Sequence, residues 1–574
     1  MIDPRIYRAG FLPALVCLVI VMFSVQPLPE PLESPVTTAG FEPGPAARAA
    51  RQIAAAAPAR TPGSADDAAA ADIVADRLGA IEGGELSEQP FEGSFDGDEV
   101  ELRNLILVLP GESEQQVVLL APRDSAEGVG LASSAAATGA LIEIAESFGG
   151  ARHSKTLVFV STTGASDGAR GAGEFVDSYP DRDLVEAAIV LDTPASSEPE
   201  PPFVVPWSAD DESTSIQLTL TAEQAVSEQT DDDAGKAPEG LFGGLARLAL
   251  PSALGEQGVL IADGLDAVAL SSTGERPLSP SRDGLDSLAI ETMGEIGGAA
   301  LALLVTLDAV TAPLEHGPSA YVSFSGNLIS GWSIALLAIA LVLPAALAAV
   351  DAMARAWRRG EGRPRDLLWA LSRSLPFLGV LLLAYLLGVT GLAPRPGFPY
   401  DPGRYEVGWG SVAVLLCLIL ALVVTWITIK PMRLPGAARR EGLASAIGVV
   451  ICVCVALVWL FNPYMALLLV PSAHVWLAAI GSGGAARRAG IAVAVVLAVA
   501  LPVIAAIDLA GRLEVGITLP WHLMLMVTGG QIPFAAAVLG CLIAGALVAL
   551  VAAALAPEQG PGAPRLAARG RAEI

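Results

Sequence analysis

The second half of this chain consists mainly of apolar runs, and each run is long enough to cross a lipid bilayer. Seven of them follow residue 327, and an eighth lies near the start of the chain. A helix of about 20 apolar residues crosses a hydrocarbon core of about 30 Å, where lipid offers no partner to an unpaired backbone group. The sequence therefore predicts an α-helical transmembrane bundle. The predicted spans are residues 10–26, 328–350, 370–392, 410–429, 443–461, 464–480, 489–509 and 531–555.

Basic residues fall in alternate loops of the predicted bundle, after the first, third, fifth and last of its C-terminal spans. Loops rich in Lys and Arg stay in the cytoplasm. We therefore expect both termini to be cytoplasmic and the segment after the first span to be extracytoplasmic. The residues that carry this pattern are Arg355, Arg358, Arg359, Arg363 and Arg365, then Lys430, Arg433, Arg439 and Arg440, then Arg487 and Arg488, and finally Arg565, Arg569 and Arg571.

The N-terminal run, residues 10–26, follows Arg5 and Arg8 and has two interpretations. A cleaved signal peptide would have a similar composition. However, no clean small-x-small cleavage site follows, and residues 27–35 are rich in Pro and Glu instead. We therefore favour an uncleaved signal anchor over a cleaved peptide.

The formal net charge of −26 is distributed unevenly along the chain. Residues 27–324 carry a net charge of −35, whereas the remainder carries +9. An acidic surface repels a phosphate backbone, so we expect no nucleic-acid partner. It favours solubility and attracts cations or a basic partner. The predicted domains are 1–28 (cytoplasmic N-terminus and signal anchor), 29–325 (acidic extracytoplasmic domain), 326–560 (transmembrane domain) and 561–574 (basic cytoplasmic tail).

Short apolar strands alternate with helical stretches in the acidic domain, which predicts an α/β/α sandwich. Two further segments, 194–214 and 223–239, are predicted to be exposed loops. The second contains three consecutive aspartates, 231–233, which we interpret as a solvated charge run, with a calcium site as the alternative. All five cysteines lie in apolar segments outside this domain, so no disulfide is expected in it. The predicted strands are 105–109, 117–120, 157–160, 187–191, 216–220 and 267–270.

Several short motifs follow one another in a characteristic order. Strand 117–120 leads into Ala-Pro-Arg-Asp-Ser at 121–125, and a Gly-rich stretch then opens a helix. A second strand ends in Thr-Thr-Gly-Ala-Ser at 162–166, and a third in Leu-Asp-Thr at 191–193. This order, together with Arg-Thr-Pro-Gly-Ser at 60–64, resembles peptidase family M28, the co-catalytic zinc aminopeptidases. The resemblance covers roughly residues 45–310 and implies an aminopeptidase-like α/β/α sandwich.

The same resemblance implies where the metal ligands would stand, and most of those positions carry other residues. A co-catalytic dizinc site needs about two His and three carboxylates, and a carboxylate base for the bridging water. We therefore expect no bound metal or other cofactor, with zinc as the cofactor if the family chemistry persists. Pro122 and Ser279 stand at the two His positions, Ser133 at the bridging Asp, Ala165 and Ser166 at the two Glu, Asp192 at a retained ligand position, and Asp124 at the carboxylate that orients the first His.

Three functions remain open. The first is a catalytically degenerate aminopeptidase-fold protein that acts as a binding or assembly scaffold in a cell-envelope membrane complex. Its partners would be the lipid bilayer and a membrane protein or lipid-linked ligand. In architecture this resembles the large membrane subunit of GPI transamidase. The second is an active membrane-bound peptidase or hydrolase with a rebuilt site. The third is a transporter of lipid or envelope precursors with an extracytoplasmic lid.

Ionisable residues are scarce in the predicted spans. His474 is the mid-span candidate, and Arg373 and Asp508 lie near span ends. Ion-coupled transport usually needs such groups at membrane depth, so the sequence disfavours ion coupling. The high usage of Ala, Gly and Arg indicates a bacterium with a GC-rich genome, and hence a bacterial plasma membrane.

Overall fold

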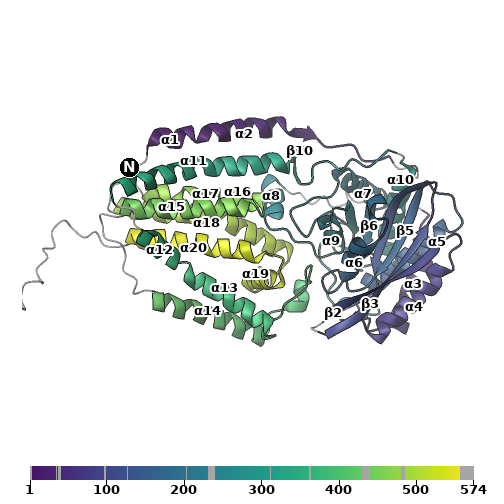
Figure 1. The fold of residues 1–574 in the computed structure, drawn as a ribbon. Helices are drawn as coiled ribbons and strands as arrows, with labels where there is room; N and C mark the ends of the chain where they lie inside the picture. The colour runs from purple at the N-terminus through teal and green to yellow at the C-terminus, as the bar shows by residue number, and fades with distance from the viewer. Residues whose placement is uncertain are drawn as a thin grey trace, which may run out of the picture.

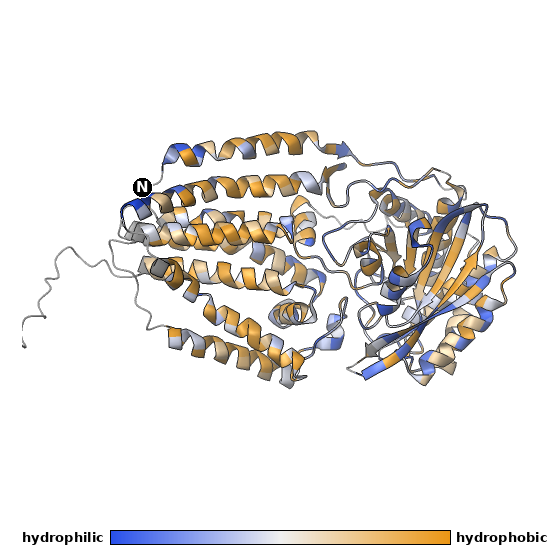
Figure 2. Ribbon diagram, viewed as in Figure 1, coloured by the Kyte–Doolittle hydropathy of each residue, from blue (hydrophilic) through white to orange (hydrophobic). Residues whose placement is uncertain are grey.

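The computed structural model describes residues 3–555 except for 34, 36–39, 96–97, 126, 202, 231–239, 311, 361–363, 430–439 and 480–484. The three aspartates at 231–233, the basic residues at 363, 430, 433 and 439, and the predicted tail 561–574 therefore lie outside the described residues. Figure 1 shows a bundle of long helices with an α/β domain at one end. Colouring by hydropathy distinguishes the two parts, because the bundle helices are apolar along most of their length (Figure 2).

A seven-stranded mixed sheet forms the centre of the α/β domain, in the order β2-β3-β5-β4-β6-β8-β7. The four central strands β5, β4, β6 and β8 are parallel, and β2, β3 and β7 run antiparallel to their neighbours. The strands are β2 (Glu85–Phe95), β3 (Asp98–Leu109), β4 (Ser113–Pro122), β5 (Lys155–Thr162), β6 (Val185–Leu191), β7 (Val204–Val205) and β8 (Ala267–Leu270).

Side chains of the central strands alternate between two apolar layers, as the pleat requires. Leu119 and Phe159 face one layer, whereas Val118 and Val158 face the other. Both faces of the sheet are covered, which is why the parallel strands read as continuous apolar runs. The predicted three-layer α/β/α sandwich is confirmed. The first layer contains α3 (Pro43–Ala56), α4 (Ala65–Gly79), α5 (Ala136–Phe148), α7 (Ile216–Gln229) and α10 (Ile290–Ala309), and the second contains α6 (Arg170–Ser178) and α9 (Gln257–Ala262).

Three sequence predictions within this domain are wrong in whole or in part. Residues 216–220, predicted as a strand, begin helix α7, which Ser215 caps by accepting a hydrogen bond from the Leu218 amide. Leu218, Ala222 and Val226 recur at helical spacing on its buried face. Helix α7 continues to Gln229, so residues 223–229 of the predicted loop 223–239 are helical, and residues 231–239 lie outside the described residues. The predicted exposed loop 194–214 is exposed at residues 197–201, but Ala195 is buried, and Val204 and Val205 are buried in the edge strand β7.

The bundle contains long helices whose bounds match seven of the eight predicted spans. Helix α10 is also long and apolar enough to cross a membrane, but it packs against α7, α3 and the sheet. These findings are consistent with a multi-pass membrane protein. The bundle helices are α1 (Pro4–Ala9) with α2 (Phe11–Phe23), α11 (Gly331–Arg358), α12 (Pro364–Ser372) with α13 (Leu375–Val389), α14 (Trp409–Ile429), α15 (Arg440–Trp459), α18 (Ala485–Arg512) and α20 (Phe534–Leu555).

The remaining predicted span, 464–480, is not one helix. It is divided into α16 (Pro463–Leu468), α17 (Val470–His474) and the short helix η5 (Val475–Ala479). Pro471 lies in the first turn of α17, where its missing amide hydrogen and its ring interrupt a continuous helix. We call residues 463–479 the broken segment. Helix α19 (Leu519–Gly529) is too short to cross a bilayer and lies at the end of the bundle near the α/β domain (Figure 1).

The two parts of the protein meet along residues 248–256, which comprise the last two residues of α8 (Leu241–Ala249) and its connection to α9. Three backbone carbonyls of this segment accept hydrogen bonds from side chains of the bundle. Asn462 donates to Leu248 O at 2.8 Å, Arg512 to Leu250 O at 3.3 Å, and Gln531 to Pro251 O at 2.7 Å. We call residues 248–256 the junction segment.

Candidate functional site

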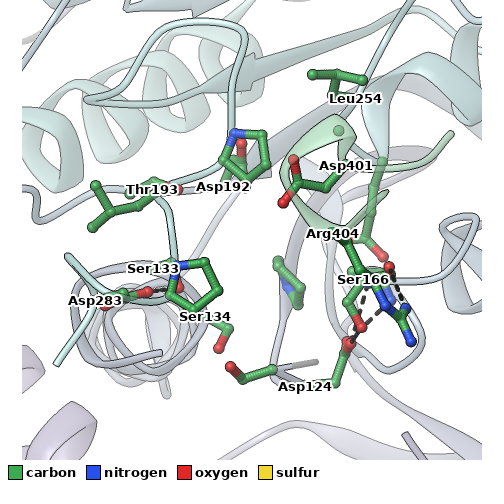
Figure 3. Close-up of a pocket in the computed structure, with 18 of the residues that line it drawn as sticks. Asp124, Ser133, Ser134, Ser166, Asp192, Thr193, Leu254, Asp283, Asp401 and Arg404 are labelled. Atoms are coloured by element: carbon green, nitrogen blue, oxygen red, sulfur yellow. Dashed lines mark hydrogen bonds between the residues drawn. The ribbon is translucent and has the colours of Figure 1, made fainter. Parts of the chain in front are cut away.

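The four parallel strands end at one edge of the sheet, and the segments that follow them surround a cleft (Figure 3). Ligand sites in open α/β sheets lie at this carboxyl edge. Six of the seven site residues predicted from the sequence line the cleft. The seventh, Ser279, is exposed and lies beside Ser281, although its neighbours Leu278 and Pro280 line the cleft. The six lining residues are Pro122, Asp124, Ser133, Ala165, Ser166 and Asp192.

Asp124 follows β4, and its carboxylate is hydrogen-bonded to the loop after β5. Its carboxylate accepts hydrogen bonds from the amides of Ala165 and Ser166, at 3.0 and 3.2 Å. The Ser166 hydroxyl donates to it at 2.6 Å. Burial raises the pKa of Asp124, and these three hydrogen bonds oppose that effect. Asp124 therefore fixes the position of the loop that carries Ala165 and Ser166.

Ser133 lies at the start of the helical segment that leads into α5, and it contacts a second buried carboxylate. Its hydroxyl donates to Asp283, which also accepts a hydrogen bond from the Ala132 amide at 2.7 Å. Ser287 donates to the same carboxylate at 3.2 Å. Asp283 thus joins the segment after β8 to the start of the helical layer, and it occupies one side of the cleft (Figure 3).

Two carboxyl groups of the cleft have strongly raised pKa values. Burial raises the pKa of Asp192 to about 6, with a further contribution from the negative charge of Asp401. Burial also raises the pKa of Glu256 to about 8, although a hydrogen bond donated by Thr162 at 3.0 Å opposes the shift. Glu256 is 3% exposed, and its Oε1 has no hydrogen-bond partner among the described residues. No motif in the sequence pointed to Glu256.

Two buried guanidinium groups lie beneath the cleft. Arg123 is 1% exposed and contacts the Asp67 carboxylate at 3.1 Å. Arg60, also buried, donates to the Arg123 carbonyl at 2.7 Å and to the Ser134 hydroxyl at 3.0 Å. Burial lowers the pKa of both arginines, and nearby carboxylates oppose that effect. Two buried, positively charged guanidinium groups therefore lie under the acidic cleft and are held by hydrogen bonds. We call Arg60 and Arg123 the base of the cleft.

One wall of the cleft comes from the bundle. The segment 390–408, between α13 and α14, reaches the α/β domain and contributes Asp401 and Arg404 to the lining (Figure 3). Arg404 donates to the Ser166 carbonyl at 3.4 Å, and its guanidinium lies 4.4 Å from the centre of the Phe95 ring. We call residues 390–408 the lid segment. No pattern in the sequence indicated the lid segment, because it is distant in sequence from every motif of the cleft.

The lid segment is held on the bundle side by α19. The Trp521 indole donates to the Tyr405 carbonyl at 2.9 Å, and the Tyr400 hydroxyl lies 3.3 Å from a ring nitrogen of His522. On the other side, a Cβ at Gly168 would lie 3.4 Å from the backbone of Gly397. The close approach of these two glycines brings the lid backbone directly against the loop that precedes α6.

The donors in the cleft do not fit the dizinc centre of the aminopeptidases. Pro122 and Ala165 have no side-chain donor, and Ser133 and Ser166 are already bonded to Asp283 and Asp124. Among the described residues, no group of three or more His, Cys, Asp or Glu side chains is arranged to hold a metal ion. His153 and His316 lie away from the cleft, where they contact Lys155 and Asp266.

Residues 104–240, which run from β3 past α7, match the family described as Peptidase family M28. The chain contains a peptidase family M28 domain. Glu256, Asp283 and the lid segment lie outside the matched residues. No curated protein matches the sequence significantly.

Solved structures with a similar fold include a glutaminyl cyclase from Porphyromonas gingivalis, with 18% identity and a TM-score of 0.40. The match covers 46% of this chain and 98% of the cyclase. A leucine aminopeptidase precursor from Bacteroides thetaiotaomicron matches with 14% identity and a TM-score of 0.39, over 48% of this chain and 99% of the precursor. A Zn-dependent exopeptidase from Parabacteroides distasonis matches with 17% identity and a TM-score of 0.35, over 46% and 98%.

Proposed function

We propose that this protein is a membrane-anchored, catalytically degenerate member of the aminopeptidase fold, and that it acts as a binding or assembly component of a cell-envelope membrane complex. One observation carries the proposal. The carboxylate that would orient a zinc-binding histidine, Asp124, is instead bonded to the loop of Ala165 and Ser166, where the family has its catalytic Glu and a ligand. The local structure of the cleft is thereby kept without a set of metal ligands.

The cleft is suited to binding because it is preformed and open. It encloses a cavity of about 160 Å³, so its own side chains do not fill it. Its walls come from both the α/β domain and the lid segment of the bundle. The bundle would hold the cleft at a fixed height above the bilayer. A partner or ligand that is itself attached to the membrane would therefore have a raised effective concentration at the cleft.

We also propose that the α/β domain is extracytoplasmic in a bacterial plasma membrane and that both termini are cytoplasmic. Asp3, beside Arg5, lies 3.6 Å from Arg355, so two of the basic regions meet at one end of the bundle. That end is the one farther from the α/β domain (Figure 1). Reporter fusions after Gly317 and after Ile574 test this topology. A cytoplasmic signal after Gly317, or an extracytoplasmic one after Ile574, contradicts it.

The substitution Ala165→Trp tests the proposed binding cleft, because it places a large side chain in the cavity. Its matched control is Ala151→Trp, an exposed position before β5 at the opposite edge of the sheet. We expect the first variant to fold yet lose its co-purifying membrane partner, and the control to retain it. Equal co-purification by both folded variants would show that the cleft is not the binding surface. Elemental analysis of the wild type tests the absence of zinc.

One observation favours a second function, a hydrolase with a rebuilt site. Glu256, with a pKa of about 8, lies in the same cleft as Asp192, with a pKa of about 6. Carboxyl groups whose pKa values are set apart by their surroundings are typical of acid–base pairs. Hydrolysis of fluorogenic aminoacyl amides by the wild type, abolished by both Glu256→Gln and Asp192→Asn, would favour this function over binding alone.

A further inference from the structure

A second cavity lies inside the bundle and is separate from the cleft. Its volume is about 470 Å³, and its lining is mostly apolar. It is bounded by α18, α20 and the broken segment, and at one end by the junction segment. We call this cavity the slot. Its lining includes Met465 and Leu469 of the broken segment, Ala498 and Pro502 of α18, and Gly540 and Ala544 of α20.

Helix interruptions and small side chains keep the slot open. Pro502 lies inside α18, where it removes one backbone hydrogen bond, and the broken segment has no continuous helix to fill the space. Gly540 and Ala544 present little side-chain volume on the facing side of α20. Ser472, which would otherwise be a polar group in an apolar wall, donates to the Ala498 carbonyl at 2.8 Å. The walls of the slot between the helices are therefore apolar.

The slot runs lengthwise through the bundle and opens to its surface. The lining residues of α20 extend from Ala536 to Leu547, which corresponds to about 16 Å along a helix. Phe461 and Val499 line the slot and are 49% and 37% exposed. A Cβ at Gly540 would meet nothing within 4 Å. In a membrane these exposed positions face hydrocarbon, so a lipid chain can enter from the side.

The end of the slot at the α/β domain is polar and presents hydrogen-bond acceptors. Gln531 is oriented by the bond that it donates to Pro251, and its Oε1 is buried without a partner among the described residues. Asp210 and Asp211 line the same end. Burial, followed by the charge of Asp210, raises the pKa of Asp211. One oxygen of Asp210 already accepts hydrogen bonds from the Ser208 hydroxyl and the Glu212 amide, at 2.7 and 2.9 Å. A cation with N–H donors would be attracted by the two carboxylates and could donate to Gln531 Oε1.

We propose that the slot binds a phospholipid of the surrounding bilayer, with one acyl chain between α18 and α20 and an ammonium-bearing head group against Asp210, Asp211 and Gln531. The apolar wall at membrane depth accounts for the chain, and the acceptors at the mouth account for the head group. This inference does not depend on the proposed function of the cleft. The slot and the cleft have different lining residues, and the variants that test them do not overlap.

The test uses the full-length protein in lipid nanodiscs that contain equal amounts of phosphatidylethanolamine and phosphatidylglycerol. Each lipid carries a photoreactive group in its acyl chain, and crosslinked peptides are mapped by mass spectrometry. We expect crosslinks to concentrate on α18 near Ala498 and on α20 near Ala544. We also expect phosphatidylethanolamine to exceed phosphatidylglycerol about tenfold at these positions, which corresponds to about 1.4 kcal/mol.

Gly540→Phe fills the slot, and Gly410→Phe is its matched control. Gly410 lies on α14, and it too has open space around a Cβ. Labelling near Ala498 should fall about tenfold in Gly540→Phe and remain unchanged in the control. If Gly540→Phe does not fold, Ala544→Leu replaces it. The double variant Asp210→Asn with Asp211→Asn should keep chain labelling but lose the preference for phosphatidylethanolamine.

Two outcomes would overturn the proposal. Labelling that is uniform over all lipid-facing helices, or unchanged by a folded slot-filling variant, would show only annular lipid. Equal labelling by the two lipids in the wild type would overturn the assignment of the head group.

Discussion

The cleft of the α/β domain and the slot of the bundle are built in opposite ways. The cleft lies where parallel strands end, and buried ion pairs and hydrogen bonds fix its polar walls. The slot lies where helices are interrupted, and its walls are small apolar side chains. A ligand of the cleft must therefore supply charge and hydrogen bonds, whereas a ligand of the slot must supply mainly apolar surface. Substitutions in the two sites should therefore change the free energy of unfolding by different amounts.

The largest expected effect comes from the buried base of the cleft. Arg123→Ala leaves the Asp67 carboxylate buried without its guanidinium, which costs about 3–5 kcal/mol of unfolding free energy. We expect the α/β domain to become sensitive to proteolysis at temperatures where the wild type resists it. Arg77→Ala is the control, because Arg77 forms an exposed ion pair with Glu146 worth about 0–1 kcal/mol. Equal sensitivity in the two variants would refute the structural role of the base.

The buried carboxyl of Glu256 should make stability depend on pH. Its pKa is about 8 in the folded protein and 4.5 as a free side chain, so the folded protein keeps a proton that the unfolded chain loses. Stability should therefore fall as pH rises between these values, by on the order of a few kcal/mol at pH 8. The substitution Glu256→Gln removes this titration. Thermal unfolding at pH 5 and pH 8 measures it, and an equal pH response in both proteins would contradict the assignment.

Packing in the bundle can be probed with two glycines. A Cβ at Gly448 would lie 2.5 Å from the Trp476 ring, so Gly448→Ala should lower stability by about 1–3 kcal/mol. Gly490, in α18, has open space around a Cβ, and Gly490→Ala should be neutral or stabilise by up to about 1 kcal/mol. Thermal unfolding in detergent distinguishes the two. Similar effects would mean that the broken segment does not pack tightly against α15.

The smallest effect is expected at the contact between the two regions. Arg404→Ala removes the hydrogen bond to Ser166 and the contact with the Phe95 ring. We expect this to lower the free energy of unfolding by about 0.5–1 kcal/mol. The main consequence should be faster hydrogen exchange in the lid segment, with little change in melting temperature. Arg395→Ala is the comparison, because Arg395 also belongs to the lid segment but donates its hydrogen bond to Thr528 of α19 and not to the cleft. Unchanged exchange in Arg404→Ala would show that Arg404 does not hold the lid.

Local signals in the sequence predicted much of the α/β domain. The apolar strands and the motifs after them located Asp124 and Asp192 at one edge of the sheet, because parallel strands bring their carboxyl ends together. The alternation of Ile216, Leu218 and Leu220 was misleading, since it suits a strand, and only packing against the sheet selects the helix. An apolar run likewise indicated a span at 464–480 without revealing that Pro471 interrupts it.

Other parts of the site could not be found in this way. Glu256 belongs to the cleft only because the junction segment brings it beneath Thr162. Asp401 and Arg404 belong to it only because the bundle docks on the α/β domain. Such contacts join residues far apart in the chain, and they carry no periodicity or spacing that a sequence can show.

The junction segment has a thermodynamic consequence. Its residues Leu254 and Glu256 line the cleft, while Leu250 and Pro251 line the slot. Any ligand that shifts this segment from one side changes the free energy of binding on the other. By linkage the coupling is reciprocal, so a lipid that alters the affinity of a cleft partner has its own affinity altered by the same factor. Membrane composition would then act as an effector of whatever the cleft binds.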